Sequence, residues 1–259
     1  MLTTPVSYQL LASNLNKTLD QTTHQPAVKR ASDYYLSKIG GIKSIDAFLG
    51  NDRIYQYAMK AFGLEDMTYA KAFMRKVLSE GIDNSGSFAN KLSDNRFKEF
   101  ATAFNFARYG GTATTFSRTQ QGTVDRHIRQ TLETDVGQSN EGVRLALYFQ
   151  RTAPTVNSAL GLLADKALLK VTQVALGLPA STSALNIDRQ VDLIKKQLNV
   201  ADLKDPAKLD RLLKRFTALW EIENPSGQAS IAPTVLVGTA TGGLDVDTLS
   251  LLQNLRAGR

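Results

Sequence analysis

The 259-residue chain contains no cysteine and only two histidines. The first absence excludes disulfides, thiolate metal sites and a cysteine nucleophile, and it is compatible with a reducing compartment. With His24 and His127 as the only imidazoles, most histidine-based metal and acid–base chemistry lacks its groups. No segment approaches the about 18 to 20 uninterrupted apolar residues of a membrane-spanning helix. The sequence therefore predicts no membrane insertion and argues against many common catalytic designs.

Glycine-rich phosphate loops are also missing. Neither G-x-G-x-x-G nor G-x-S-x-G occurs, and the segment 238–243 reads GTATGG with Leu244 where a Walker loop needs lysine. The glycine pairs 40–41, 110–111 and 242–243 are better explained as linkers. We accordingly predict no cofactor.

The spacing of the acidic residues does not indicate catalytic carboxylates or metal ligands. Glu133 and Asp135 are two positions apart on a predicted helix, so they point to different sides and cannot share a proton. Arg129 is the expected ion-pair partner of Glu133 at i, i+4. His127 is expected to pack at the edge of a helix face, and His24 to be solvated. The sequence predicts no catalytic residue and no metal.

Positive charge is in excess, with 31 Lys and Arg against 24 Asp and Glu, a net charge of +7 and a pI of about 9.5. Such an excess raises nucleic acid or an anionic membrane surface as partners. The charge is spread thinly, however, and the tightest basic clusters, at 195–196 and 211–215, are interleaved with aspartates. Mixed-sign faces are typical of solvated helices, so the sequence argues against nucleic acid.

Charge is absent from the first 16 residues, and Ser, Thr, Asn and Gln fill 12 of the first 26 positions. A cleavable secretory signal is not predicted, because no basic region precedes an apolar run. The segment resembles an uncleaved type III export signal, but an ordinary frayed terminus has the same composition and is the favoured interpretation. Tyr8, Leu11, Leu15 and Leu19 recur at helical spacing. This stripe either docks on a partner or packs on the protein's own core.

The apolar period is helical almost everywhere, which predicts an all-α fold. Thr123 is the expected N-cap of a helix to about Val136, and Asn140 is expected to cap the next helix. The only strand signal lies at 231–237, where Pro233 limits it to a short extended segment. The predicted core residues are Leu49, Ile54, Phe62, Phe97, Phe100, Phe104, Leu163, Leu168, Leu176, Leu213, Phe216 and Trp220.

An internal repeat is the most informative feature of the sequence. A shift of 114 positions places residues 34–64 on 148–178 without a gap. Gly63 and Gly177 fall on equivalent positions, where each is expected to stop a helix in the left-handed conformation. The identical pairs are Tyr34 with Tyr148, Ser44 with Ser158, Leu49 with Leu163, Ala61 with Ala175, Gly63 with Gly177 and Leu64 with Leu178.

The repeat predicts a pseudo-symmetric two-repeat helical protein with four regions. These are a polar segment or helix at 1–25, repeat 1 at 26–110, linker helices with repeat 2 at 111–222, and a loop with a C-terminal amphipathic helix at 223–259. The candidate interface residues lie on the first and last of these regions, and they are Tyr8, Leu11, Leu15, Leu251 and Leu255.

The residues around the repeat also carry a resemblance. Five short segments resemble a bacterial family of unknown function whose genes often lie among flagellar genes. They are the helix start at 48–52 (FLGND), the helix stop at 61–64 (AFGL), their counterparts at 162–165 and 175–178, and the closing segment 251–256 (LLQNLR). The resemblance extends from about residue 30 to the end of the chain. It implies an all-helical fold and a place in flagellar assembly or function, and it supplies no catalytic residue.

Three classes of function follow. We expect a non-enzymatic helical interaction protein with a protein partner, serving flagellar assembly, export or structure, because an amphipathic helix can dock in a partner's groove. The first alternative is a small-molecule-binding protein or enzyme that uses the cleft between the repeats. The second alternative is a nucleic-acid-binding regulator. The expected location is the cytoplasm, or outside the cell after flagellar type III export. The sequence does not indicate the oligomeric state.

Overall fold

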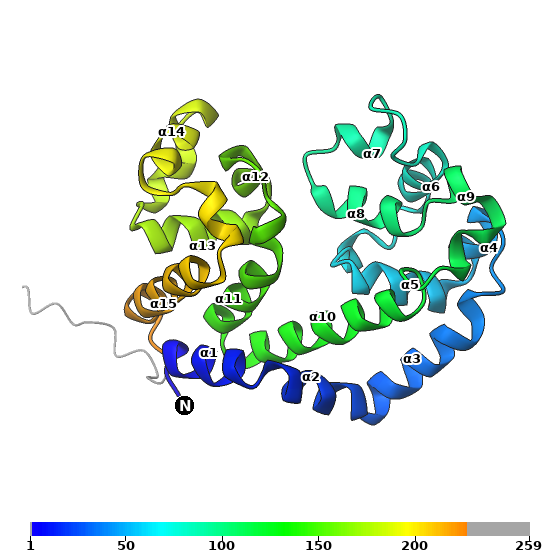
Figure 1. Ribbon diagram of the computed structural model, residues 1–259, viewed down its shortest axis with the longest axis horizontal. Coiled ribbons are helices and arrows are strands. Elements are labelled where there is room, and N and C mark those ends of the chain that lie inside the picture. The colour runs from blue at the N-terminus through cyan, green and yellow to red at the C-terminus, as the bar shows by residue number, and fades with distance from the viewer. Residues whose placement is uncertain (1, 227–259) are drawn as a thin grey trace, which may run out of the picture. The chain divides into compact units, whose positions relative to one another are not determined.

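The computed structural model describes residues 2–226, and this part of the chain is all-α, with no strand (Figure 1). The predicted extended segment at 231–237 and the predicted C-terminal helix, with Leu251 and Leu255, lie outside the described residues. The α-helices are α1 (Thr4–Ser13), α2 (Leu15–His24), α3 (Pro26–Ile39), α4 (Ile45–Gly50), α5 (Asp52–Ala61), α6 (Lys71–Glu80), α7 (Phe88–Lys91), α8 (Asn95–Ala103), α9 (Phe106–Tyr109), α10 (Gln121–Ser139), α11 (Glu141–Thr152), α12 (Ala159–Ala164), α13 (Lys166–Leu176), α14 (Ile187–Gln197) and α15 (Pro206–Glu223). Short 3-10 turns connect them: η1 (Glu65–Met67), η2 (Gly110–Thr115), η3 (Ala153–Thr155), η4 (Ala180–Ala184) and η5 (Val200–Lys204).

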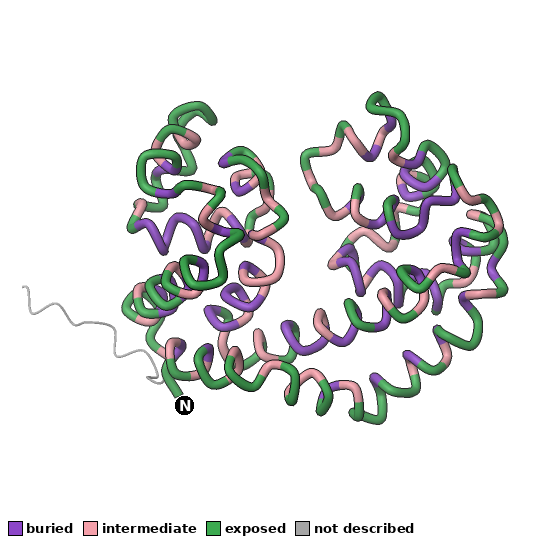
Figure 2. Tube along the Cα trace, in the orientation of Figure 1, coloured by how far each residue is buried: buried purple, intermediate pink, exposed green. Residues whose placement is uncertain are grey.

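Two hydrophobic clusters organise these helices. The first cluster consists of buried side chains between Val28 and Ile128, from α3 to α10, and the second consists of Tyr8 with buried side chains between Val143 and Trp220. The 19-residue helix α10 packs on α5 of the first cluster and on α11 of the second. The buried faces of the helices turn toward their neighbours, while their outer faces remain exposed (Figure 2). Each half of the described chain therefore has its own core.

Equivalent helices begin with equivalent caps. The hydroxyl of Ser44 accepts the amide of Ala47 at 3.1 Å, and 114 residues later the hydroxyl of Ser158 accepts the amide of Gly161 at 3.2 Å. The next helix of each half is also capped by a side chain, that of Asn51 in the first half and that of Asp165 in the second. A side-chain acceptor at this position satisfies one of the unpaired amides of the first turn.

Equivalent glycines end α5 and α13. Gly63 has φ of 69° and Gly177 has φ of 67°. The following residue bonds back five positions in both places, Leu64 N to Met59 O at 2.8 Å and Leu178 N to Gln173 O at 2.9 Å. This closure needs a left-handed residue, which glycine adopts without steric cost. A short 3-10 turn and further helices follow each glycine: η1, α6, α7 and α8 in the first half, and η4, α14, η5 and α15 in the second. The two-repeat division remains our interpretation of these pairs.

Some boundaries differ from the sequence-based expectations. Helix α10 begins at Gln121 rather than after Thr123, because the hydroxyl of Thr123 donates to Arg118 O (3.2 Å) inside the turn that precedes the helix. Asn140 caps α11 as predicted, accepting the amide of Val143 at 3.0 Å. The predicted core residues are buried with the exception of Leu163, which is only partly buried against the second cluster.

None of the helices in the part of the chain described by the structure has both the length and the apolar character that crossing a membrane requires.

Candidate interaction surfaces

The N-terminal helix α1 is fixed to the fold at its first turn. The amide of Thr4 donates to Glu221 Oε2 at 2.7 Å, and the side chain of Thr4 shares a hydrogen bond with Asn140. Thr4 is fully buried. Burial raises the pKa of Glu221, but hydrogen bonds from Ser226 and Thr4 outweigh it and lower this pKa to about 2. A carboxylate at a helix N-terminus is also favoured by the helix dipole.

The inner face of α1 belongs to the second cluster. Tyr8 is only 2% exposed, and Leu11 packs beside it. Trp220 closes this contact from α15, and it lies so near Gly142 of α11 that a side chain at Gly142 would overlap the indole ring. Leu15, at the start of α2, is half-buried. Tyr8 therefore packs in the protein's own core and is not available to a partner. Of the two interpretations of the N-terminal stripe, docking on a partner or packing on the core, the structure shows packing for this residue.

The outer face of α1 carries a second apolar stripe. Val6 and Leu10 are 50% and 56% exposed, and their spacing of four places them on one side of the helix. Leu2, two residues before the first residue of α1, is 57% exposed. We call these three residues the α1 stripe. Nearby on α15, Ile222 is also exposed. The two stripes of α1 both have helical spacing, and only the fold decides which one the core takes.

The cleft between the two halves is lined with polar groups. Two neighbouring cavities, of about 290 and 680 Å³, share Asp94, Arg96, Tyr148 and Asp165 in their walls. The Tyr148 hydroxyl donates to Asp165 Oδ2 at 2.5 Å, and the other oxygen of Asp165 accepts two amides at the start of α13. Burial, and then the charge of Asp165, raise the pKa of Tyr148.

On the opposite wall, the guanidinium of Arg96 donates to both oxygens of Asp94 and to the carbonyl of Gly63. Asp94 also accepts the amide of Arg96 as the N-cap of α8. The charged groups at the centre of the cleft are thus committed to capping helices and closing turns.

Glu133 is the most deeply buried carboxylate, with 2% of its surface exposed. Arg129 binds it at 2.9 Å, as the sequence predicted, and Arg151 of α11 adds two bonds of 3.0 Å. The second arginine was not foreseen, since it lies 18 residues away. Asp135 is exposed and takes no part. Two arginines around one carboxylate compensate the cost of burying its charge and tie α10 to α11.

His127 is a core residue. It is 6% exposed, and its ring stacks on Tyr57 with centroids 3.9 Å apart. Burial, with a smaller effect of Lys60, lowers the pKa of His127 to about 4. The side chain of His24 is 71% exposed. Within residues 2–226, no three His, Asp or Glu side chains gather in a way that could hold a metal ion.

Comparison with known proteins gives a family and a solved relative. The model of a family described as "Protein of unknown function (DUF1217)" matches residues 61–209, more than half of the chain. The crystal structure of protein AGR_C_984 from Agrobacterium tumefaciens is 49% identical in sequence, with a TM-score of 0.80, over 85% of this chain and 94% of that one. No curated protein matches the chain significantly. The resemblance to a family of unknown function is confirmed: the chain belongs to the DUF1217 family.

Proposed function

We propose that this protein is a non-enzymatic helical interaction protein that docks through the α1 stripe in an apolar groove of a partner protein. The observation that carries the proposal is the exposure of Val6 and Leu10 on a helix whose opposite face is fixed in the core, with Leu2 exposed just before it. Anchors four residues apart are the pattern by which a helix enters a groove. Because α1 is already folded and held, its docking costs little conformational entropy.

The absence of charge around the stripe supports an apolar partner. The first 16 residues contain no charged side chain, although the whole chain has a net charge of +7. A docking helix that buries no charge avoids the desolvation cost of unpaired charged groups. The partner groove should accordingly be apolar and lack charged residues at its centre.

We further propose that the partner is a flagellar assembly, export or structural protein. The support for this part is the resemblance to a family whose genes often lie among flagellar genes, together with the uncharged, Ser/Thr/Asn-rich first residues that type III export signals share. The proposal includes a cytoplasmic location or passage through the flagellar export route.

The test uses a flagellated bacterium that carries this gene. The gene is replaced by variants in which the α1 stripe is changed. The double substitution Val6→Gln with Leu10→Gln should reduce motility and filament number and abolish co-purification of a flagellar protein. The matched control is Leu160→Gln with Ile187→Gln, two residues that are each 52% exposed away from α1. Both variants should unfold at the temperature of the unmodified protein, because exposed substitutions change stability little.

Each part of the proposal can fail separately. Full motility after deletion of the gene would contradict the flagellar role. Reduced motility and retained partner binding in the α1-stripe variant would contradict docking through α1, as would equal effects of the control variant.

The cleft between the halves supports a second candidate function, binding of a small molecule. Its observation is the cavity of about 680 Å³ beside Arg96 and Asp165, a size within the range of ligand sites. The polar groups there already bond to one another, and this favours the interaction role. A metabolite that co-purifies with the protein and is lost in Tyr148→Phe would support the cleft instead.

A further inference from the structure

A groove along α10 differs in character from both the α1 stripe and the central cleft. Two adjoining hollows, of about 440 and 530 Å³, share Asn95, Glu99 and Arg126 in their walls and run between α8, α10 and the end of α11. We call them together the α8–α10 groove. Its cationic side chains are Lys98, Arg118, Arg126, Arg129 and Arg151.

The groove has a positive excess that its own carboxylates do not neutralise. Glu99 and Asp125 are the acidic residues of its walls, and Glu133 lies buried behind Arg129 and Arg151. Five cations therefore face three carboxylates. Arg126 pairs with Glu99 at 3.1 Å, whereas neither Lys98 nor Arg118 forms an ion pair within the described residues.

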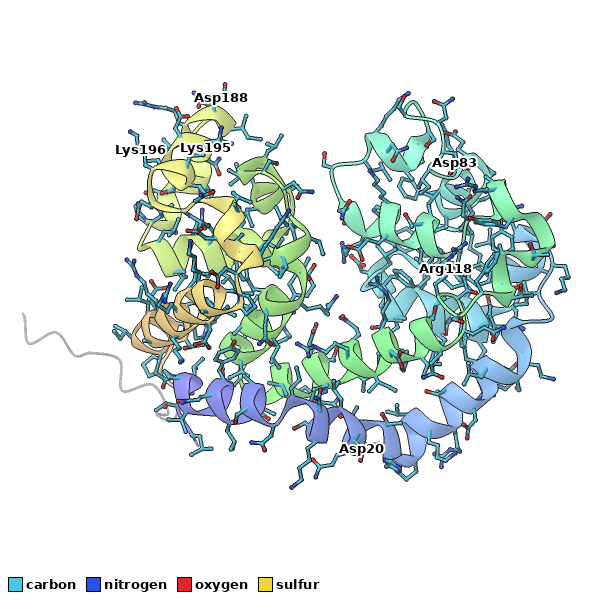
Figure 3. All side chains as sticks on the ribbon, viewed as in Figure 1. Asp20, Asp83, Arg118, Asp188, Lys195 and Lys196 are labelled. Carbon is cyan, nitrogen blue, oxygen red and sulfur yellow. The ribbon has the colours of Figure 1, made fainter. Side chains whose placement is uncertain are left out.

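Arg118 is held in place without being neutralised. Its Nε donates to the carbonyl of Ala103 at 3.0 Å, and its guanidinium lies over the rings of Phe116 and Tyr109, with 4.4 and 4.8 Å to their centroids. Figure 3 labels this residue in the half of the chain that contains α8. A guanidinium supported on aromatic rings loses little freedom when it binds an anion, and its planar fork matches a carboxylate. Arg118 is thus preorganised for an acidic ligand.

From these observations we infer that the α8–α10 groove binds an acidic, extended segment of a partner protein. Charge complementarity identifies the ligand, since a peptide with carboxylates opposite Lys98 and Arg118 would neutralise the positive excess. Glu99 and Asp125 interrupt the positive wall. A nucleic-acid backbone, with its regular charge, would meet repulsion at these two residues, whereas a peptide can present neutral residues there. This inference is independent of the α1 stripe.

The test uses the full chain and a fluorescein-labelled peptide of eight glutamates, with binding followed by fluorescence anisotropy at low and physiological salt. The double variant Lys98→Gln with Arg118→Gln should weaken binding at least fivefold. The matched control is Lys195→Gln with Lys196→Gln, which removes the same charge from exposed positions of α14 (Figure 3). The control should change the affinity less than twofold, and both variants should keep the thermal transition of the unmodified protein.

A variant that is expected to strengthen binding controls for misfolding, because a misfolded protein would bind the peptide more weakly. Asp125 is exposed and accepts a hydrogen bond from Gln121 at 2.8 Å, which asparagine can retain. Asp125→Asn should therefore tighten peptide binding severalfold.

Three outcomes would overturn the inference. The first is an equal loss in both double variants, which would mean that binding follows net charge alone. The second is no binding of the peptide at millimolar concentration in physiological salt. The third is tighter binding of a twelve-nucleotide oligouridine that depends on Lys98 and Arg118, which would assign the groove to nucleic acid.

Discussion

The two hydrophobic clusters place different side chains on equivalent helices. In the first, Phe48 contacts Phe104 and Phe106 with centroids 5.0 and 5.9 Å apart, within a larger group of aromatic rings. In the second, the position equivalent to Phe48 is Leu162, which is equally buried and has mainly aliphatic neighbours. The same caps and the same glycine stop therefore accommodate two kinds of core. Helix order follows from polar and glycine positions, while core volume is set locally.

The second cluster also depends on more distant parts of the chain. Tyr8 reaches it from α1, and Thr4 bonds to Glu221 across 217 residues. Closing a longer loop costs more chain entropy, although this cost grows only slowly with the length of the loop. The first cluster is built from residues 28–128 and needs no comparable closure.

The outer surfaces differ as well. In the first half, Asp46 of α4 pairs with Arg75, and Asp52 pairs with Lys71 at 2.5 Å. The residue equivalent to Asp46 is Leu160, which is 52% exposed. The first half thus closes this surface with ion pairs, and the second half leaves an apolar side chain there.

The largest expected effect comes from the side chain that joins α1, α11 and α15. Trp220→Ala should lower the free energy of unfolding by about 3–5 kcal/mol, because it leaves a large cavity in the second cluster. Chemical denaturation measures the loss, and hydrogen exchange should show that amides of the second cluster open before those of the first. The control is Ile222→Ala on the same helix, which is 76% exposed and should cost less than about 0.5 kcal/mol. A loss below about 1 kcal/mol for Trp220→Ala would contradict its role in the core.

A difference in pH sensitivity should distinguish the clusters next. His127 stacks on Tyr57, whereas the residue equivalent to Tyr57 in the second cluster is Val171. The pKa of His127 is about 4 in the folded state against an ordinary 6.5, so between these values the unfolded chain binds more protons. Stability should therefore fall as the pH falls from about 6.5 to about 4, by at most about 3 kcal/mol.

Thermal unfolding between pH 7 and pH 4 measures this slope. His127→Gln should reduce it, and His24→Gln, which changes an exposed side chain, should leave it unchanged. An unaltered slope in His127→Gln would show that other groups cause the acid sensitivity.

Exchange of the equivalent core residues should have a smaller effect. Leu162→Phe forces a larger ring into an aliphatic site, and Phe48→Leu leaves space among aromatic rings, so each should destabilise by about 1–3 kcal/mol. Equilibrium unfolding in urea measures both. If the double variant were as stable as the unmodified protein, the two cores would be interchangeable and the contrast between them would be without energetic consequence.

Local patterns predicted much of this molecule. The helical period, the Asn140 cap and the pairing of Arg129 with Glu133 all depend on residues a few positions apart, and the structure contains them. The bonds from Arg151 to Glu133 depend instead on how α11 folds back beside α10. No periodicity carries that information, and for the same reason the sequence could not decide which face of α1 meets the core.

The smallest expected effect tests whether the two halves are equivalent at one residue. Gly63→Ala and Gly177→Ala both place a side chain on a left-handed residue, which costs about 1–2 kcal/mol. A methyl group at Gly177 would meet nothing within 4 Å, and at Gly63 the nearest atom, Cδ of Arg96, would be 3.8 Å away. The cost should therefore be backbone strain alone, and it should be the same in both variants by urea denaturation.

Gly50→Ala provides the control for these glycines, because it also has free space but no positive φ. This substitution should leave the stability unchanged or raise it slightly, since alanine restricts the unfolded chain. Losses at Gly63 and Gly177 that differ by more than about 1 kcal/mol would mean that the surroundings, rather than the shared helix stop, set the requirement for glycine. Equal losses together with a neutral Gly50→Ala would show that one backbone geometry is used twice in cores of different composition.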